Sequence, residues 1–117
     1  MIYKDRIVVG LVEKITINGG KKRKTLIAKI DTGATKSSMD TKLAEEMKLG
    51  PVIKNRLIKS AHGNKIRPVI EVEIEIADKK IKSEFTLADR EHMKYGVLIG
   101  QNILKHGFLV DPLKDGQ

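Results

Sequence analysis

The stretch AKIDTGATKSS, residues 28–38, raises the central question about this chain. It places Asp31 directly after an apolar run and follows it with Thr32, Gly33 and Ala34. Asp and Gly are common in turns, because an Asp side chain accepts hydrogen bonds from nearby backbone N–H groups and Gly tolerates positive φ. The bare tripeptide is therefore compatible with a capped turn, and only its context favours a catalytic carboxylate.

The residues before Asp31 predict a β-hairpin. Apolar residues between 6 and 17 keep one parity, which is the period of a half-buried strand, and Glu13 interrupts them. Asn18, Gly19 and Gly20 suit a tight turn, and residues 24–30 return as the second strand. This hairpin delivers the chain directly to Asp31.

The residues after the loop predict a short helix. Residues 40–49 have the apolar spacing of an amphipathic helix. Asp40 is its candidate N-cap, and Gly50 and Pro51 form its stop.

A second hairpin is predicted beyond this helix. Residues 53–60 form one strand, a turn at 62–64 follows, and residues 65–77 form a long strand in which isoleucine and valine alternate with glutamate. Pro68 places the start of that strand at an edge or a bulge, because proline cannot donate to a strand ladder. After a turn at 78–80, residues 81–88 return as another strand.

The last third contains VLIGQNIL, residues 97–104. The pattern predicts a buried strand at 97–99 that ends in Gly100, a short helical turn over 101–104 and a final strand at 108–110. A chain of 117 residues suits one domain, which we take to span residues 1–117. The predicted fold is mostly β with one or two short helices.

The composition excludes several classes of site. The absence of cysteine excludes disulfides, thiolate zinc sites and Cys nucleophiles. The net charge of +8 includes a run of basic residues at 21–24, which is typical of a solvated hairpin tip, although contact with phosphate stays open. Because aromatic residues are scarce, no base-stacking platform is evident, which argues against the binding of single-stranded nucleic acid.

Metal, nucleotide and membrane binding are not expected. His62, His92 and His106 are scattered and no His-Glu-x-x-His occurs, so we predict no metal. The chain has no P-loop, and we predict no cofactor. No apolar segment approaches the ~20 residues that span a bilayer, so we expect a cytoplasmic protein with no membrane partner.

Two motifs together resemble those of the retropepsin-like aspartic proteases. The first stands here as Asp31-Thr32-Gly33-Ala34, and the second, before a short helix, as Leu98-Ile99-Gly100. The order of hairpins, loop, helix and final strand agrees over roughly residues 6–113. The resemblance implies an acid-protease β-barrel, closed or partly open. It is nearest to a prokaryotic branch often labelled putative ATP-dependent zinc proteases, which implies association with a glutamate ligase.

The resemblance also implies a mechanism. Two carboxylates that share one proton activate a water and polarise the substrate carbonyl. Because the chain has one Asp-Thr-Gly, a homodimer would supply one Asp31 from each copy. The Thr32 hydroxyl would bond across the two-fold axis, Gly33 would bring its N–H to the carboxylate, and Ala34 would line the cleft. Leu98, Ile99 and Gly100 would pack the loop.

A flap that closes over a peptide is also implied. Its best match is the turn that contains Ala61, His62, Gly63 and Asn64, although an ordinary exposed hairpin explains this turn equally well. Viral members often carry acidic residues after the first motif and Arg after the second, and these residues form an ion pair that braces the dimer. Here these positions hold Thr35, Lys36 and Gln101, so that ion pair cannot form.

The sequence thus predicts an aspartic endopeptidase that cleaves a peptide or protein substrate as a homodimer. A noncatalytic peptide-binding or assembly module with the same fold is the alternative. A basic nucleic-acid-binding barrel is a third interpretation, and it rests on net charge alone.

Overall fold

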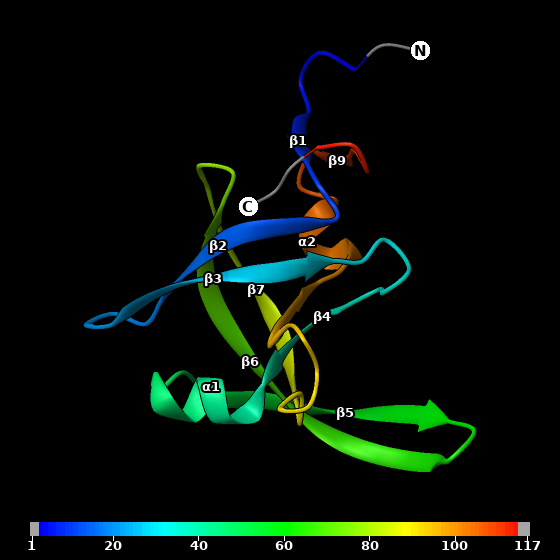
Figure 1. Ribbon diagram of the computed structural model, residues 1–117. Coiled ribbons are helices and arrows are strands. Elements are labelled where there is room, and N and C mark those ends of the chain that lie inside the picture. Colours follow the sequence, from blue (N-terminus) through cyan, green and yellow to red (C-terminus); the bar gives the residue numbers. More distant parts are fainter. Residues whose placement is uncertain (1–2, 115–117) are drawn as a thin grey trace.

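The computed structural model describes residues 3–114, most of which lie in β-strands (Figure 1). Within these residues the elements follow in the order β1 (Ile7–Val9), β2 (Val12–Asn18), β3 (Arg23–Ile30), β4 (Ser37–Asp40), α1 (Thr41–Glu46), β5 (Val52–Ser60), β6 (Gly63–Ile76), β7 (Lys79–Ala88), β8 (Val97–Ile99), α2 (Gln101–Leu104) and β9 (Phe108–Val110).

Six of these strands close into a barrel. Neighbouring strands follow the order β2-β3-β8-β4-β7-β6, and an antiparallel pairing of β6 with β2 joins the two ends. Ile15 lies opposite Ile76 and Ile17 opposite Ile74 in this closing pair. Closure removes the free strand edges of an open sheet. The predicted β-barrel with short helices is therefore confirmed.

The barrel interior is aliphatic, and β6 supplies much of it. Ile70, Val72, Ile74 and Ile76 are at most 3% exposed, while the intervening glutamates lie on the outer face. Phe85 of β7 is the largest of the fully buried side chains. The predicted alternation of this strand is confirmed, because residues two apart lie on the same face of a sheet.

The first predicted strand is divided in two at Gly10 and Leu11. β1 leaves the barrel there and pairs in parallel with β9. Glu13 is only 6% exposed and accepts hydrogen bonds from the Gly10 amide and from Lys114 Nζ. These two donors compensate for the burial of a carboxylate in β2, where the parity would place an apolar residue.

An arm extends from the barrel (Figure 1). It consists of β5 and the first half of β6, which pairs with β7 only from Val69 onward. Pro68 lies opposite Asn55 in the arm, where β5 is the one described partner of β6, so the predicted edge position is confirmed. The tip differs slightly from the prediction. Ala61 and His62 form the turn, and Gly63 already belongs to β6.

Two local predictions need correction. Asp40 occupies the N-cap position of α1, but its side chain makes no cap hydrogen bond and instead accepts one from the Arg90 amide at 2.8 Å. The turn expected at 78–80 consists of Ala77 and Asp78, both with positive φ, while Lys79 begins β7. The Asp40 contact joins residues 50 apart in the sequence, whereas the shorter turn follows from the pairing of Ile76 with Lys79.

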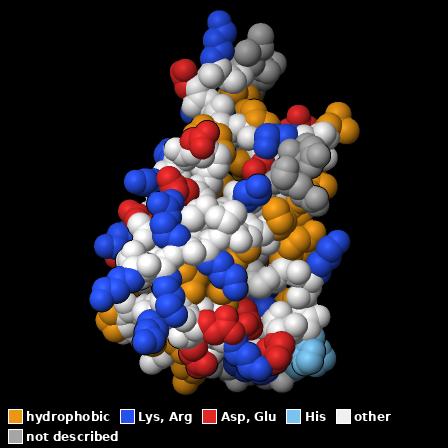
Figure 2. Space-filling model, turned by 60° about the vertical axis from the view of Figure 1, so that its left-hand side comes forward, with side chains coloured by type: hydrophobic (Ala, Val, Ile, Leu, Met, Phe, Trp, Pro, Cys, Tyr) orange, Lys and Arg blue, Asp and Glu red, His pale blue; other side chains and the backbone are white. Residues whose placement is uncertain are grey.

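The charged surface has no single basic patch on the face shown in Figure 2. Lysine and arginine side chains are spread over that face, and acidic side chains lie among them. Arg23, from the basic run, pairs with Glu75 of β6 at 2.5 Å. Within residues 3–114 no helix is long and apolar enough to cross a membrane.

Two isoleucines of β6 give a matched test of this fold. Ile74 is 0% exposed in the barrel, whereas Ile66 is 72% exposed on the arm. We expect Ile74→Ala to lower the free energy of unfolding by about 2–5 kcal/mol, because it leaves a cavity. Ile66→Ala should cost less than about 1 kcal/mol. Urea denaturation measures both, and equal losses would contradict the assigned barrel interior.

Candidate active site

The loop that carries Asp31 crosses the end of another strand. β3 runs parallel to β8, β8 runs antiparallel to β4, and β8 lies between the two. The connection from β3 to β4, residues 31–36, must therefore pass over the end of β8. Two motifs far apart in the sequence meet at this crossing.

Asp31 is held by one backbone contact with β8 and one within its own loop. Its amide donates to the Ile99 carbonyl at 2.9 Å, and the Gly33 amide donates to Asp31 Oδ1 at 2.9 Å. Asp31 is half-buried, while Thr32 and Gly33 are exposed. A Cβ on Gly33 would lie 3.3 Å from Asp31 Oδ1. The carboxylate is thus held by its own loop at an open face of the molecule.

Gly100 is the point of closest approach under the loop. A Cβ at this position would lie 2.3 Å from the Lys36 carbonyl oxygen and 2.8 Å from that of Ala34. Ile99 is fully buried and Leu98 partly so, and both pair with β3. The crossing is possible because residue 100 has no side chain.

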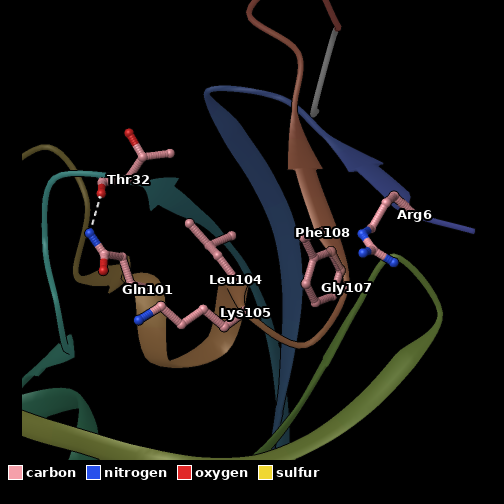
Figure 3. Close-up of a pocket in the computed structure, with 7 residues that line it drawn as sticks. All are labelled: Arg6, Thr32, Gln101, Leu104, Lys105, Gly107 and Phe108. Carbon is pink, nitrogen blue, oxygen red and sulfur yellow. Dashed lines mark hydrogen bonds between the residues drawn. The ribbon is translucent and has the colours of Figure 1, made fainter. Parts of the chain in front are cut away.

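Gln101 and Asn102 also hold the loop, although the sequence prediction placed neither among the candidate site residues. The Gln101 amide donates to the Ala34 carbonyl at 2.8 Å, and the Asn102 amide donates to Thr35 at 3.2 Å. Gln101 Nε2 donates to the Thr32 carbonyl at 2.8 Å (Figure 3). The first N–H groups of a helix lack intrahelical partners. A predicted helix start directly after Gly100 was the available signal for these contacts.

A cleft of about 520 Å³ lies between the loop and the arm. One wall consists of residues 33–38, and the arm contributes Arg56, Ile58 and Arg67. The segment after β7 supplies a third wall that includes Arg90 and Met93. The candidate flap residues Ala61, His62, Gly63 and Asn64 form the tip of the same arm and do not line this cleft.

The cleft is rich in cationic side chains. Lys36, Arg56, Arg67 and Arg90 line it, against the single carboxylate of Asp89. Arg56 and Arg67 lie directly opposite each other in the arm. Arg56 donates to Thr86 Oγ1 at 3.0 Å and lies 3.7 Å from Glu84. Arg67 is half-buried and forms no ion pair within residues 3–114.

Arg90 is held in place on the cleft wall. Its Nε donates to the Tyr95 carbonyl at 3.1 Å, and its backbone amide donates to Asp40. Burial lowers the pKa of the Arg90 guanidinium, while the carboxylates of Asp40 and Asp31 act in the opposite direction. Arg90 therefore lies within electrostatic reach of Asp31.

A second hollow, of about 560 Å³, adjoins the other side of the loop (Figure 3). Residues of three segments line it, namely Arg6, Thr32, Gln101, Leu104, Lys105, Gly107 and Phe108. It combines two cations with the partly accessible edges of two apolar side chains. Thr32 connects this hollow to the exposed face beside Asp31.

The three histidines do not converge. His62 lies at the arm tip, His92 in the segment after β7 and His106 after α2. Within residues 3–114 no three His, Asp or Glu side chains group so as to hold a metal ion.

Comparison with known proteins identifies the family. The sequence profile of the RimB-like family, described as "Retropepsin-like aspartic endopeptidase RimB", matches residues 39–116. The chain belongs to this family. The matched segment contains Arg56, Arg67 and Arg90 of the cleft and the motif Leu98-Ile99-Gly100, whereas Asp31 precedes its first residue. No curated protein matches the sequence.

Two solved structures resemble the fold of this RimB-like chain. The crystal structure of Lpg0085 from Legionella pneumophila subsp. pneumophila str. Philadelphia 1, titled as a protein of unknown function, has 23% identity and a TM-score of 0.62. That match covers 92% of this chain and 94% of Lpg0085. The solution structure of Simian Foamy Virus (mac) protease has 22% identity and a TM-score of 0.62, covering 80% and 91% of the two chains. These likenesses establish a retropepsin-like fold.

Two glycines provide a matched test of the crossing. We expect Gly100→Ala to displace the loop and to lower the free energy of unfolding by about 1–3 kcal/mol, because the new Cβ overlaps backbone oxygens. Gly96→Ala is the control, since its Cβ would meet nothing nearer than 3.9 Å. Thermal and urea denaturation measure the difference. An undisturbed Gly100→Ala protein would contradict the close approach.

Proposed function

We propose that the protein is an aspartic endopeptidase whose active site forms between two copies of the chain, each contributing one Asp31. The observation that carries this proposal is the position of Asp31. The carboxylate accepts a hydrogen bond from the Gly33 amide in an exposed loop, and Gly33, two residues after Asp31, is the first loop residue that lines the cleft. Membership of the RimB-like family supports the same reaction class.

The chemistry needs both carboxylates. The ionised Asp31 takes a proton from water as the water oxygen bonds to the peptide carbonyl carbon, and the protonated Asp31 of the second copy donates its proton to the carbonyl oxygen. The first Asp31 then gives the proton that it took from water to the amide nitrogen, and the second Asp31 takes a proton from one hydroxyl of the resulting diol as the carbon–nitrogen bond breaks. This yields a carboxylic acid and an amine and restores both carboxyl groups. Because the two groups are coupled, they titrate as a pair.

A second copy is required because the chain holds one Asp-Thr-Gly. The exposed Thr32 and Gly33 and the adjoining hollow at Arg6, Leu104 and Phe108 supply a surface against which that copy packs. A two-fold arrangement would place the same surface on both sides of the contact and bring the two loops together. Thr32 would then lie beside its counterpart.

The cleft favours peptides with acidic side chains. Arginine binds carboxylates through charge-assisted hydrogen bonds, and Arg67 has no carboxylate partner in the described part of the chain. An extended peptide would be held by main-chain hydrogen bonds while alternate side chains face Arg67 and Arg90. This preference accords with the association with a glutamate ligase that the sequence resemblance implied.

The alternative is a noncatalytic module with the same fold. Such a protein would bind acidic peptides in the cationic cleft without cleaving them. The spread of basic and acidic side chains over one face gives less support to a nucleic-acid-binding role. Peptide cleavage separates the endopeptidase from both other functions.

Asp31→Asn tests the catalytic role. Incubation with acidic and neutral peptides over a range of pH, followed by mass spectrometry, should reveal cleavage by the native chain and a loss of about 10³-fold or more in the variant. Asp78→Asn, in the turn between β6 and β7, is the matched control and should retain full activity. Cleavage that survives Asp31→Asn would refute the assignment, and binding without any cleavage would favour the module. Sedimentation should detect dimers under the active conditions.

Arg67→Gln tests the substrate preference. We expect KM for acidic peptides to rise roughly tenfold, because one charge-assisted contact is lost, while KM for neutral peptides changes little. Lys80→Gln removes an exposed cation outside the cleft and serves as the control. Equal effects of Arg67→Gln on both peptide classes would contradict a carboxylate contact at this residue.

A further inference from the structure

We propose that Gln101 and Asn102 are positioning residues that order the Asp31 loop within a single copy of the chain, before a second copy binds. The effect on catalysis rests on the proposed function, whereas the ordering of the loop does not. The inference goes beyond the dimer, because it states which contacts shape the active-site loop and from which copy they come.

The first observation is that α2 satisfies three carbonyl groups of the loop. Those of Thr32, Ala34 and Thr35 accept hydrogen bonds from Gln101 Nε2, the Gln101 amide and the Asn102 amide. The carbonyl of one residue and the amide of the next residue belong to the same planar peptide group. Fixing the Thr32 carbonyl therefore also restrains the Gly33 amide, which donates to the Asp31 carboxylate.

The second observation is that Asn102 anchors this arrangement to the barrel. Its Oδ1 accepts from Ser37 Oγ at 2.7 Å, and its Nδ2 donates to Ser83 Oγ and to the Glu84 carbonyl, both at 3.0 Å. Ser37 is fully buried, and its Oγ accepts a hydrogen bond from the Gly100 amide at 2.9 Å. Satisfied polar networks of this kind rigidify the groups they connect. The end of the loop, the start of α2 and β7 therefore form one unit.

The third observation concerns charge. Gln101 is neutral, and its side-chain donor is directed to a carbonyl of its own loop. The loop residues Thr35 and Lys36 supply no carboxylate. The contacts that order the loop are therefore uncharged and internal, so neither a second copy nor low salt is needed to make them.

Hydrogen exchange on the dilute native chain tests this ordering without any substrate. We expect the amides of Asp31 and Ala34, which donate to Ile99 and to the Asp31 carbonyl, to be protected at concentrations where sedimentation finds monomer. Gln101→Met removes the side-chain donor at similar length and should speed exchange over residues 31–35 by about tenfold or more. Exchange in β6 and β7 should stay unchanged. Gln101→Arg restores a donor and should recover protection.

Activity supplies the second readout. Gln101→Met should lower kcat about 10- to 100-fold with little change in KM, because a misplaced carboxylate still leaves the cleft intact. Asn102→Ala should lower both protection and kcat. Lys80→Gln, which lies away from the loop, is the control for both measurements.

Two results would overturn the proposal. One is loop protection that appears only at concentrations where the chain is dimeric. The other is protection and kcat in Gln101→Met equal to those of the native chain. If the native chain cleaves no peptide while Gln101→Met loses loop protection, the proposed function fails and the ordering role stands.

Discussion

The geometry of the site depends on the passage of one loop over Gly100. β3 and β4 are separated by β8, so their connection has to cross the end of that strand. The crossing brings the loop backbone so near to residue 100 that a single methyl group would overlap the carbonyls of Lys36 and Ala34. Because the loop lies so close, the amides of Gln101 and Asn102, which follow Gly100, reach the loop carbonyls. Asp31 is held still as a result.

The same crossing gives the loop two environments. On one side is the cationic cleft beneath the arm, and on the other is the hollow next to Thr32. Asp31 stands between them, half-buried. In the proposed function, this carboxylate would act on a peptide in the cleft, whose lining begins at Gly33, while its loop stays open to another copy of the chain. Under that proposal, substrate recognition and completion of the site would use separate surfaces.

The fold was predictable where residues follow one period. The alternation of isoleucine with glutamate in β6 indicated a buried and a wet face, and Pro68 marked the edge segment of the strand, which joins the barrel from Val69 onward. Prediction was weaker where a polar side chain meets a distant partner. Asp40 resembled an N-cap but bonds the Arg90 amide, and Glu13 is buried because Gly10 and Lys114 donate to it. Local patterns carry no information about such partners.

The sequence by itself determined most of the strands, although not β4, because side-chain periodicity and turn chemistry are local properties. Its two motifs carried the resemblance that implied the barrel. Only the tertiary structure decided that β6 closes onto β2, that three arginines from distant segments line one cleft, and that Gln101 and Asn102 hold the loop. These features depend on which residues meet after the chain has folded. A glutamine after a Gly motif has no evident role until the carbonyl that it bonds lies beside it.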